Sequence, residues 1–247
     1  ISYYECSDIL NEYVGIVHGK KDDIGKITSK YFVGPSSYTL QMENIVPELE
    51  DSVTPNIRVD YTVTDKADGD RMLCFVNGKG KIYFIDTNMN VRFSGAITKT
   101  KTLFSSILDG EYIKKDKHGK EINVYAAFDV YCIDKKSTRK LPFYSKEIVV
   151  SDGDDGEIIE TESRYLKLGD FIQKLDAISI LDKSHDQEVK PDKKQMSSGV
   201  RFQIKEFEAT SDINDIFKCC NNVLSRVNDG RFEYETDGLI FTPAYLP

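Results

Sequence analysis

Short runs of apolar and β-branched residues dominate the middle of the chain. Six of these runs have the length and composition of β-strands, and turn-forming residues separate them. They cover residues 61–64, 71–76, 81–85, 91–94, 107–113 and 124–133. The segment Asn77-Gly78-Lys79-Gly80 is the clearest hairpin signal among the connections. The pattern predicts sheets whose strands are mainly antiparallel.

Apolar residues spaced three and four positions apart predict helices in the second half of the chain. Residues 211–227 place their apolar side chains on one helical face, and Ser211 is positioned to cap the first turn. A weaker pattern of the same period covers residues 165–181, and a last strand is predicted at 239–242. The polar segments 152–163 and 181–199 are expected to be loops. The predicted fold class is α+β, with mainly antiparallel sheets flanked by helices.

Composition and charge argue against several classes of protein and site. The chain has 247 residues, of which 40% are apolar and 30% charged, enough for one large domain or two small ones. The net charge of −8 argues against a stand-alone nucleic-acid binder, although lysine clusters at 114–120 and 135–140 remain available as local basic surfaces. No apolar run is long enough to span a membrane. Five cysteines without CxxC spacing indicate neither disulfides nor zinc, and favour a reducing compartment.

The candidate chemistry is concentrated at Lys66-Ala67-Asp68-Gly69-Asp70-Arg71, between two predicted strands. A lysine that attacks phosphorus must be neutral, and burial together with nearby cations, such as Arg71 or a metal ion, favours the neutral amine. An arginine at this position is also suited to hold a nucleotide hydroxyl or phosphate. The alternative is that Asp68-Gly69 is simply a hairpin turn, because the chain contains six Asp-Gly dipeptides.

Four segments in this order resemble the motifs of the mRNA-capping guanylyltransferases and, more distantly, of ATP-dependent DNA ligases and RNA ligases. The segments are Lys66–Arg71, Leu108-Asp109-Gly110-Glu111, Ala127-Phe128-Asp129-Val130 and Thr236-Asp237-Gly238-Leu239-Ile240-Phe241. The resemblance implies a nucleotidyltransferase (adenylation-domain) core. It also implies that Lys66 forms a covalent lysyl-N-GMP intermediate.

The same resemblance implies roles for the other motif residues. Asp68, Gly69 and Arg71 would help to bind the nucleotide, and Glu111 would hold a ribose hydroxyl or a metal-bound water. Asp129 and Asp237, with Glu111, would bind the divalent ion, Mg²⁺ or Mn²⁺, or position the lysine. Phe128 and Ile240 resemble the residues that sandwich the purine, and plain core packing is the alternative for both.

Two further segments favour GTP over ATP. Ile204-Lys205-Glu206-Phe207 resembles the stretch in which a capping-enzyme lysine contacts guanine O6, and a lysine donor suits that carbonyl. Phe32-Val33-Gly34-Pro35 with Tyr38-Thr39-Leu40 also resembles capping enzymes. The implied substrates are GTP and a 5′-diphosphate RNA end. The alternatives are a polynucleotide ligase that adenylates the same lysine, and a non-catalytic module with the same fold.

The resemblance covers residues 32–247, which are expected to be the nucleotidyltransferase core. Residues 1–31 match nothing and are expected to be an N-terminal segment, such as the tail of a preceding domain. The family's fifth motif and its C-terminal OB-fold lid are absent from the sequence, which implies that the isolated fragment can be inactive. The stretch 84–91 resembles capping enzymes of large cytoplasmic DNA viruses. That origin implies fused triphosphatase and methyltransferase domains, no membrane association, and a location in the infected cytoplasm or the virion.

Overall fold

The computed structural model describes residues 1–19, 25–47, 54–145, 147–150, 157–160, 162–179, 199–211 and 215–245. Its helices are α1 (Tyr3–His18), α2 (Arg164–Lys174) and α3 (Ile216–Asn228), and short 3₁₀ turns are η1 (Ser29–Tyr31), η2 (Met42–Asn44) and η3 (Lys101–Leu103). The strands are β1 (Tyr61–Ala67), β2 (Asp70–Val76), β3 (Lys81–Asp86), β4 (Val91–Ile97), β5 (Ser106–Lys115), β6 (Glu121–Ile133), β7 (Lys136–Ser137), β8 (Glu147–Val150), β9 (Glu157–Glu160), β10 (Ile178–Ser179), β11 (Arg201–Ile204), β12 (Glu208–Ala209) and β13 (Thr236–Pro243).

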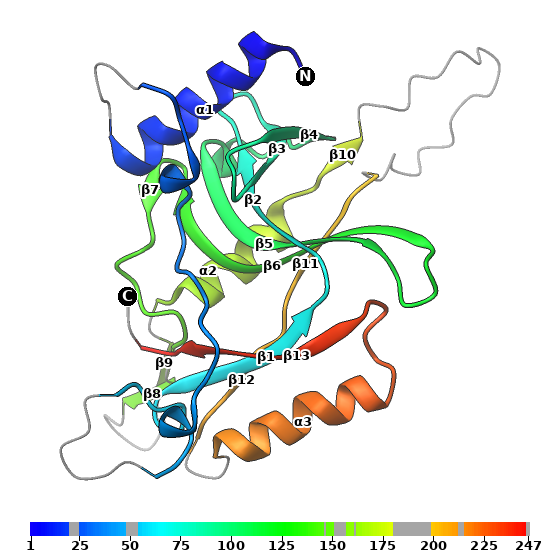
Figure 1. The fold of residues 1–247 in the computed structure, drawn as a ribbon. Coiled ribbons are helices and arrows are strands. Elements are labelled where there is room, and N and C mark those ends of the chain that lie inside the picture. The colour runs from blue at the N-terminus through cyan, green and yellow to red at the C-terminus, as the bar shows by residue number, and fades with distance from the viewer. Residues whose placement is uncertain are drawn as a thin grey trace.

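Two sheets form the body of the molecule (Figure 1). The larger has the order β10-β4-β3-β2-β5-β6-β11, with β7 paired to β6, and the smaller has the order β12-β1-β13. Strands β8 and β9 pair with each other. Within these sheets β11 runs parallel to β6, and the other pairs are antiparallel. The predicted class of mainly antiparallel sheets flanked by helices is confirmed.

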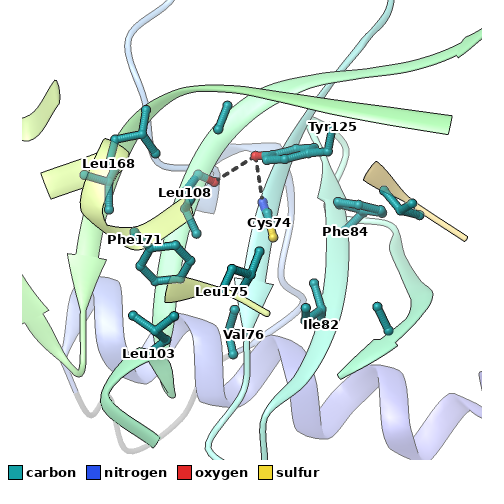
Figure 2. Close-up of a cluster of buried hydrophobic side chains, with 14 of the residues drawn as sticks. Cys74, Val76, Ile82, Phe84, Leu103, Leu108, Tyr125, Leu168, Phe171 and Leu175 are labelled. Atoms are coloured by element: carbon teal, nitrogen blue, oxygen red, sulfur yellow. Dashed lines mark hydrogen bonds between the residues drawn. The ribbon is translucent and has the colours of Figure 1, made fainter. Parts of the chain in front are cut away.

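The central strands of the larger sheet are buried on both faces. On β2, Cys74 and Val76 face a cluster that includes Leu168 and Phe171 of α2, as Figure 2 shows. The hydroxyl of Tyr125 lies within this cluster, where it accepts a hydrogen bond from the Cys74 amide at 3.2 Å. The alternate residues of β2 face α1 on the other side. A strand that is covered on both faces has apolar residues at consecutive positions, and residues 72–76 of β2 are all apolar.

Helix α1 was not predicted, yet it belongs to the core. Ile9, Tyr13 and Val14 pack against β2 and β3 residues of the larger sheet. The Tyr13 hydroxyl donates to the Tyr31 carbonyl oxygen and accepts from the Val33 amide, each at 2.9 Å, so it ties the helix to the segment that follows. The N-terminal segment therefore packs together with the core that was predicted to begin at residue 32.

Helix α3 covers one face of the smaller sheet. Ile216, Cys219 and Val223 pack against Val63 of β1, in the region at the bottom of Figure 1. The predicted helix is confirmed, but its cap is Asp215, whose carboxylate accepts from the Lys218 amide at 2.8 Å. The expectation for Ser211 was wrong because the first turn begins at Ile216, next to a better placed acceptor.

Two other segments differ from the sequence-based expectation. Helix α2 ends at Lys174, and Asp176 has a φ of 37°, which a continuing helix does not allow. The chain then adds β10 to the edge of β4. The loop expected at 152–163 is replaced at 157–160 by β9. The loop expected at 181–199 lies outside the described residues except at its last position. In the described part of the chain, no helix has the length and apolarity to cross a membrane.

Candidate active site

The segment Lys66–Arg71 carries the chain from the smaller sheet to the larger one. Strand β1 ends at Ala67 and pairs with β12 and β13, whereas β2 begins at Asp70 and pairs with β3 and β5. The Asp68-Gly69 step is therefore not a hairpin turn, because the strands on either side of it belong to different sheets. Lys66, with 48% of its side chain exposed, lies at this junction.

The Lys66 amine is held by Asp237. Its Nζ lies 2.6 Å from both carboxylate oxygens. The pairing register of β1 and β13 shifts between Asp65 and Ala67, so that Asp237 and Gly238 together lie opposite Lys66. Gly238 has a φ of 146°, a conformation that side chains rarely adopt. Such a bulge aims the side chains around it, here a carboxylate at the lysine.

Gly69 allows β5 to approach the same segment. A Cβ at Gly69 would lie 2.8 Å from Cγ of Glu111 and 2.9 Å from the Tyr112 carbonyl oxygen. The sequence motif thus places Glu111 directly beside the Lys66–Arg71 segment. Burial raises the pKa of the Glu111 carboxyl to about 7, with a further rise from Asp109, against the charges of Lys205, Arg71 and Lys66. Glu111 makes no ion pair with any described residue.

Replacing Gly69 with alanine is expected to destabilise the fold by about 1–3 kcal/mol and to displace Glu111, because the new methyl group overlaps atoms that include a carbonyl oxygen. The change should appear as a lowered midpoint in chemical denaturation. Gly199→Ala is the matched control, since a Cβ there has no neighbour within 4 Å. Equal stability of the two variants would show that β5 does not pack closely on Gly69.

Glu111 is expected to make stability depend on pH. Below its ordinary pKa of 4.5 the carboxyl is protonated in both states, but between 4.5 and about 7 only the unfolded chain loses the proton. The free energy of unfolding therefore falls as pH rises through this window. Glu111→Gln should remove about 1–2 kcal/mol of that fall, after allowance for solvent screening. Unfolding of both proteins at about pH 5 and about pH 8 measures the difference, and parallel pH profiles would contradict it.

Arg71 makes contacts that the sequence did not indicate. Its guanidinium donates to both oxygens of the fully buried Asp109, at 2.6 and 3.2 Å, and to the Pro35 carbonyl oxygen at 2.8 Å. The Tyr131 hydroxyl donates to the same carboxylate at 2.7 Å. A Cβ on Gly34 would lie 2.6 Å from Nη2 of Arg71. In this structure Arg71 therefore fixes the loop at residues 32–35 against the larger sheet.

The expected metal ligands are not gathered into one set. Asp129 is buried and accepts from Arg164 Nε at 2.9 Å, and burial raises the pKa of this carboxyl to about 6, against the effect of Arg164. Within the described residues, no group of three or more His, Cys, Asp or Glu side chains is arranged to hold a metal ion. The metal role of Asp129 stays a prediction, and in this structure its partner is an arginine. Glu111 and Asp237 remain, and two carboxylates with substrate phosphates suit Mg²⁺.

Lys205 is buried beneath the site. Its Nζ donates to the Asp65 carbonyl oxygen at 2.5 Å and to Oδ2 of Asp65 at 2.9 Å, and both side chains are 2% exposed. Burial lowers the pKa of Lys205, and Asp65 opposes the shift. As placed here, Lys205 is not free to contact a base, because its amine is committed to Asp65. Its contact with guanine stays a prediction.

The remaining predicted site residues lie around this junction. Phe128 is partly exposed, and the Arg71 guanidinium lies 5.8 Å from its ring centroid. Ile240 lies on β13 opposite Thr64 of β1 and outside the cluster formed by its neighbours and α3. Asp68 is exposed, and its amide donates to the Glu235 carbonyl oxygen at 2.9 Å. Both Phe128 and Ile240 are partly buried, and their contact with the base stays a prediction.

The model of the family described as "mRNA capping enzyme, catalytic domain" matches residues 26–195, more than half of the chain. The chain belongs to the mRNA capping enzyme family. The resemblance that the motifs carried is thereby confirmed.

One capping-enzyme relative is viral. The chain is 28% identical over 154 residues to a probable mRNA-capping enzyme of Acanthamoeba polyphaga mimivirus, and the match covers 58% of this chain and 13% of the relative. Solved structures also resemble this capping-enzyme domain. A mycobacterial DNA ligase D complexed with ATP and MES gives a TM-score of 0.41 at 12% identity, covering 76% of this chain and 50% of the ligase. A structure named Pmar-Lig_Pre. gives a TM-score of 0.39 at 13% identity, and the match covers 76% of this chain and 40% of that structure's chain.

Proposed function

We propose that this chain carries the guanylyltransferase core of an mRNA capping enzyme, with Lys66 as the nucleophile. The supporting observation is a half-exposed lysine at the junction of the two sheets, held by Asp237 and next to Glu111, in a member of the capping-enzyme family. A primary amine presented in this way is suited to nucleophilic catalysis once it is neutral.

The proposed reaction has two steps. Nζ of Lys66 attacks the α-phosphorus of GTP, a P–N bond forms, the bond to the β-phosphate oxygen breaks, and pyrophosphate leaves. Asp237 holds the ammonium form beforehand. The amine loses one proton before it attacks and a second as the P–N bond forms, and the Asp237 carboxylate takes up a proton and passes it to solvent. In the second step an oxygen of a 5′-diphosphate RNA end attacks the same phosphorus. The P–N bond then breaks, the lysine is regenerated, and the RNA carries the GMP.

A divalent ion is proposed to bind at Glu111 and Asp237. Carboxylate oxygens are the ligands that Mg²⁺ and Mn²⁺ prefer, and an ion there would neutralise charge that develops on the departing pyrophosphate. Asp129 is the third predicted ligand, and in this structure its carboxylate is paired with Arg164 of α2, whose Nη1 also donates to the Leu141 carbonyl oxygen at 2.7 Å. Phe128 and Ile240 remain the proposed neighbours of the base.

The wider setting is also a proposal. The matched region is a small part of the mimivirus relative, which supports a domain that works beside others. Triphosphatase and methyltransferase domains are the proposed neighbours, as the viral resemblance implies. A location in the infected cytoplasm follows from the viral resemblance.

Covalent labelling tests the proposed function. The chain is incubated with α-labelled GTP or ATP and Mg²⁺ or Mn²⁺, and label that survives denaturing electrophoresis is measured. The longest parent polypeptide is run in parallel, because this chain matches only 13% of its mimivirus relative. Labelling by GTP and not by ATP is expected. Labelling by ATP alone would convert the proposal to a ligase, and no labelling of either protein would favour a non-catalytic module.

A further inference from the structure

The ends of β5 and β6 form an arm that leaves the larger sheet beside the candidate site. We define this arm as residues 114–121, and Figure 1 shows the green hairpin extending beyond the neighbouring strands. The register of the two strands shifts between Ile113 and Lys115, and Asn123 on the opposite strand has a φ of 48°. This irregularity bends the arm away from the plane of the sheet.

The base of the arm is attached to the segment that carries Lys66. Ile113, the residue before the arm, is 3.1 Å from the position of a Cβ on Gly69. The next residue, Lys114, donates to the Asp70 carboxylate at 2.8 Å. A molecule that bound along the arm would therefore end next to the candidate nucleophile. At about 3.3 Å per residue, Glu111 and Lys117 are separated by roughly 20 Å of strand.

The tip of the arm has a fixed conformation. The Asp116 side chain accepts from the amides of His118 and Lys120, at 2.8 and 2.9 Å, and Gly119 takes a φ of 81°. The Lys117 amide donates to the Glu233 carbonyl oxygen at 3.2 Å, which attaches the tip to the segment before β13. Such a tip loses little conformational entropy when a ligand binds.

The charge of the arm is opposite to that of the chain. It carries four lysines against two carboxylates, in a protein of net charge −8. Lys115, Lys117 and Lys120 are exposed and make no ion pair with any residue that the structure describes. The Asp116 carboxylate is occupied by the turn. Three unpaired ammonium groups on a rigid ribbon suit a chain of phosphates.

We propose that this arm binds the backbone phosphates of the acceptor RNA and guides its 5′ end to Lys66. The inference rests on the proposed function, because it assigns the arm to the second substrate of that reaction. The arm takes no part in forming the lysyl-GMP intermediate, which needs GTP, the divalent ion and the residues around Lys66. An acidic protein that uses a polyanionic substrate needs a local basic surface of this kind, since its overall field repels RNA.

The test compares two triple variants of the full chain. Lys115, Lys117 and Lys120 are changed to glutamine in the arm variant. Lys135, Lys136 and Lys140 are changed to glutamine in the control, which removes the same charge from another exposed cluster. Two of these control lysines, Lys136 and Lys140, line a cavity of about 500 Å³ beside α2, and none of the predicted site residues is among the residues that line it. A third variant replaces the arm lysines with arginine.

Binding is measured with a fluorescent single-stranded RNA bearing a 5′-diphosphate, as anisotropy over a range of salt. The arm variant is expected to bind at least about ten-fold more weakly than the wild type at low salt. It should also lose up to about 2 units of the slope of log affinity against log salt. The control and the arginine variant should bind like the wild type. Thermal unfolding confirms that all variants are folded.

GMP adduct formation is measured in the same samples, so that the two proposals can fail separately. An adduct in the wild type with equal RNA affinity in the arm and control variants overturns the arm proposal alone. If the wild type forms no adduct but only the arm variant loses RNA affinity, the result counts against the proposed function and supports RNA binding by the arm. The arm proposal is also overturned if the wild type does not bind RNA, or if the control variant loses as much RNA affinity as the arm variant.

Discussion

Replacing Lys66 with arginine is expected to abolish the covalent adduct with GMP while leaving the fold intact. Arginine keeps the positive charge beside Asp237, but a guanidinium stays protonated and is not a nucleophile. The ion pair is half-exposed on both sides, so its contribution to stability is at most about 1 kcal/mol. Lys66→Ala should lose the adduct equally. The measurement is retained label on each purified variant, together with its unfolding midpoint.

The control for this pair is Lys79→Ala, an exposed lysine in the turn between β2 and β3. It should be labelled as strongly as the wild type. Labelling of Lys66→Arg at the level of the control would mean that another residue carries the nucleotide. In that case Lys66 would not be the nucleophile, and its place at the junction of the two sheets would need another explanation.

Replacing Asp109 with alanine is expected to lower the free energy of unfolding by about 3–5 kcal/mol. Asp109 is fully buried and is the common acceptor for Arg71 and Tyr131. Its loss leaves a largely buried guanidinium without its partner and a buried hydroxyl without an acceptor. It also releases the loop that Arg71 holds through Pro35. Chemical denaturation gives the change in stability directly.

Asp70→Ala provides the matched comparison. Asp70 precedes Arg71 on the same strand, but its ion pair with Lys114 is more than half exposed on both sides. Removing it should cost less than about 1 kcal/mol. If both aspartate variants unfold at the same denaturant concentration, the buried network around Arg71 does not stabilise the fold as described.

Local patterns in the sequence were enough to predict most of the strands. Residues 71–76 and 81–85 fall within β2 and β3, and the hairpin signal between them is confirmed by the bond from the Asn77 amide to the Lys81 carbonyl oxygen. Helix α3 was predicted because its apolar spacing is strong. Helix α1 was missed although its sequence carries a signal, since Ser2 caps the Glu5 amide and Ile9, Tyr13 and Val14 share one face.

The motifs predicted which residues gather, but not which ones bind each other. Lys66, Asp237 and Glu111 are brought to one junction, as the motif order suggested. The partner of Asp129 is Arg164, more than thirty positions later in the chain, and no local pattern identifies it. The pairing of Lys205 with Asp65 is likewise set by how the two sheets pack. Such tertiary contacts decide whether a carboxylate or an amine is free, and the sequence alone does not reveal them.

The central claim is that Lys66 carries the nucleotide, and mapping the labelled residue tests it most directly. The chain, or its longest parent polypeptide, is treated with GTP and Mg²⁺ and digested at alkaline pH, because a phosphoramidate hydrolyses in acid. Tandem mass spectrometry then locates the GMP. The account predicts GMP on Lys66 and none after ATP replaces GTP. GMP on another residue, or AMP rather than GMP on Lys66, would contradict it.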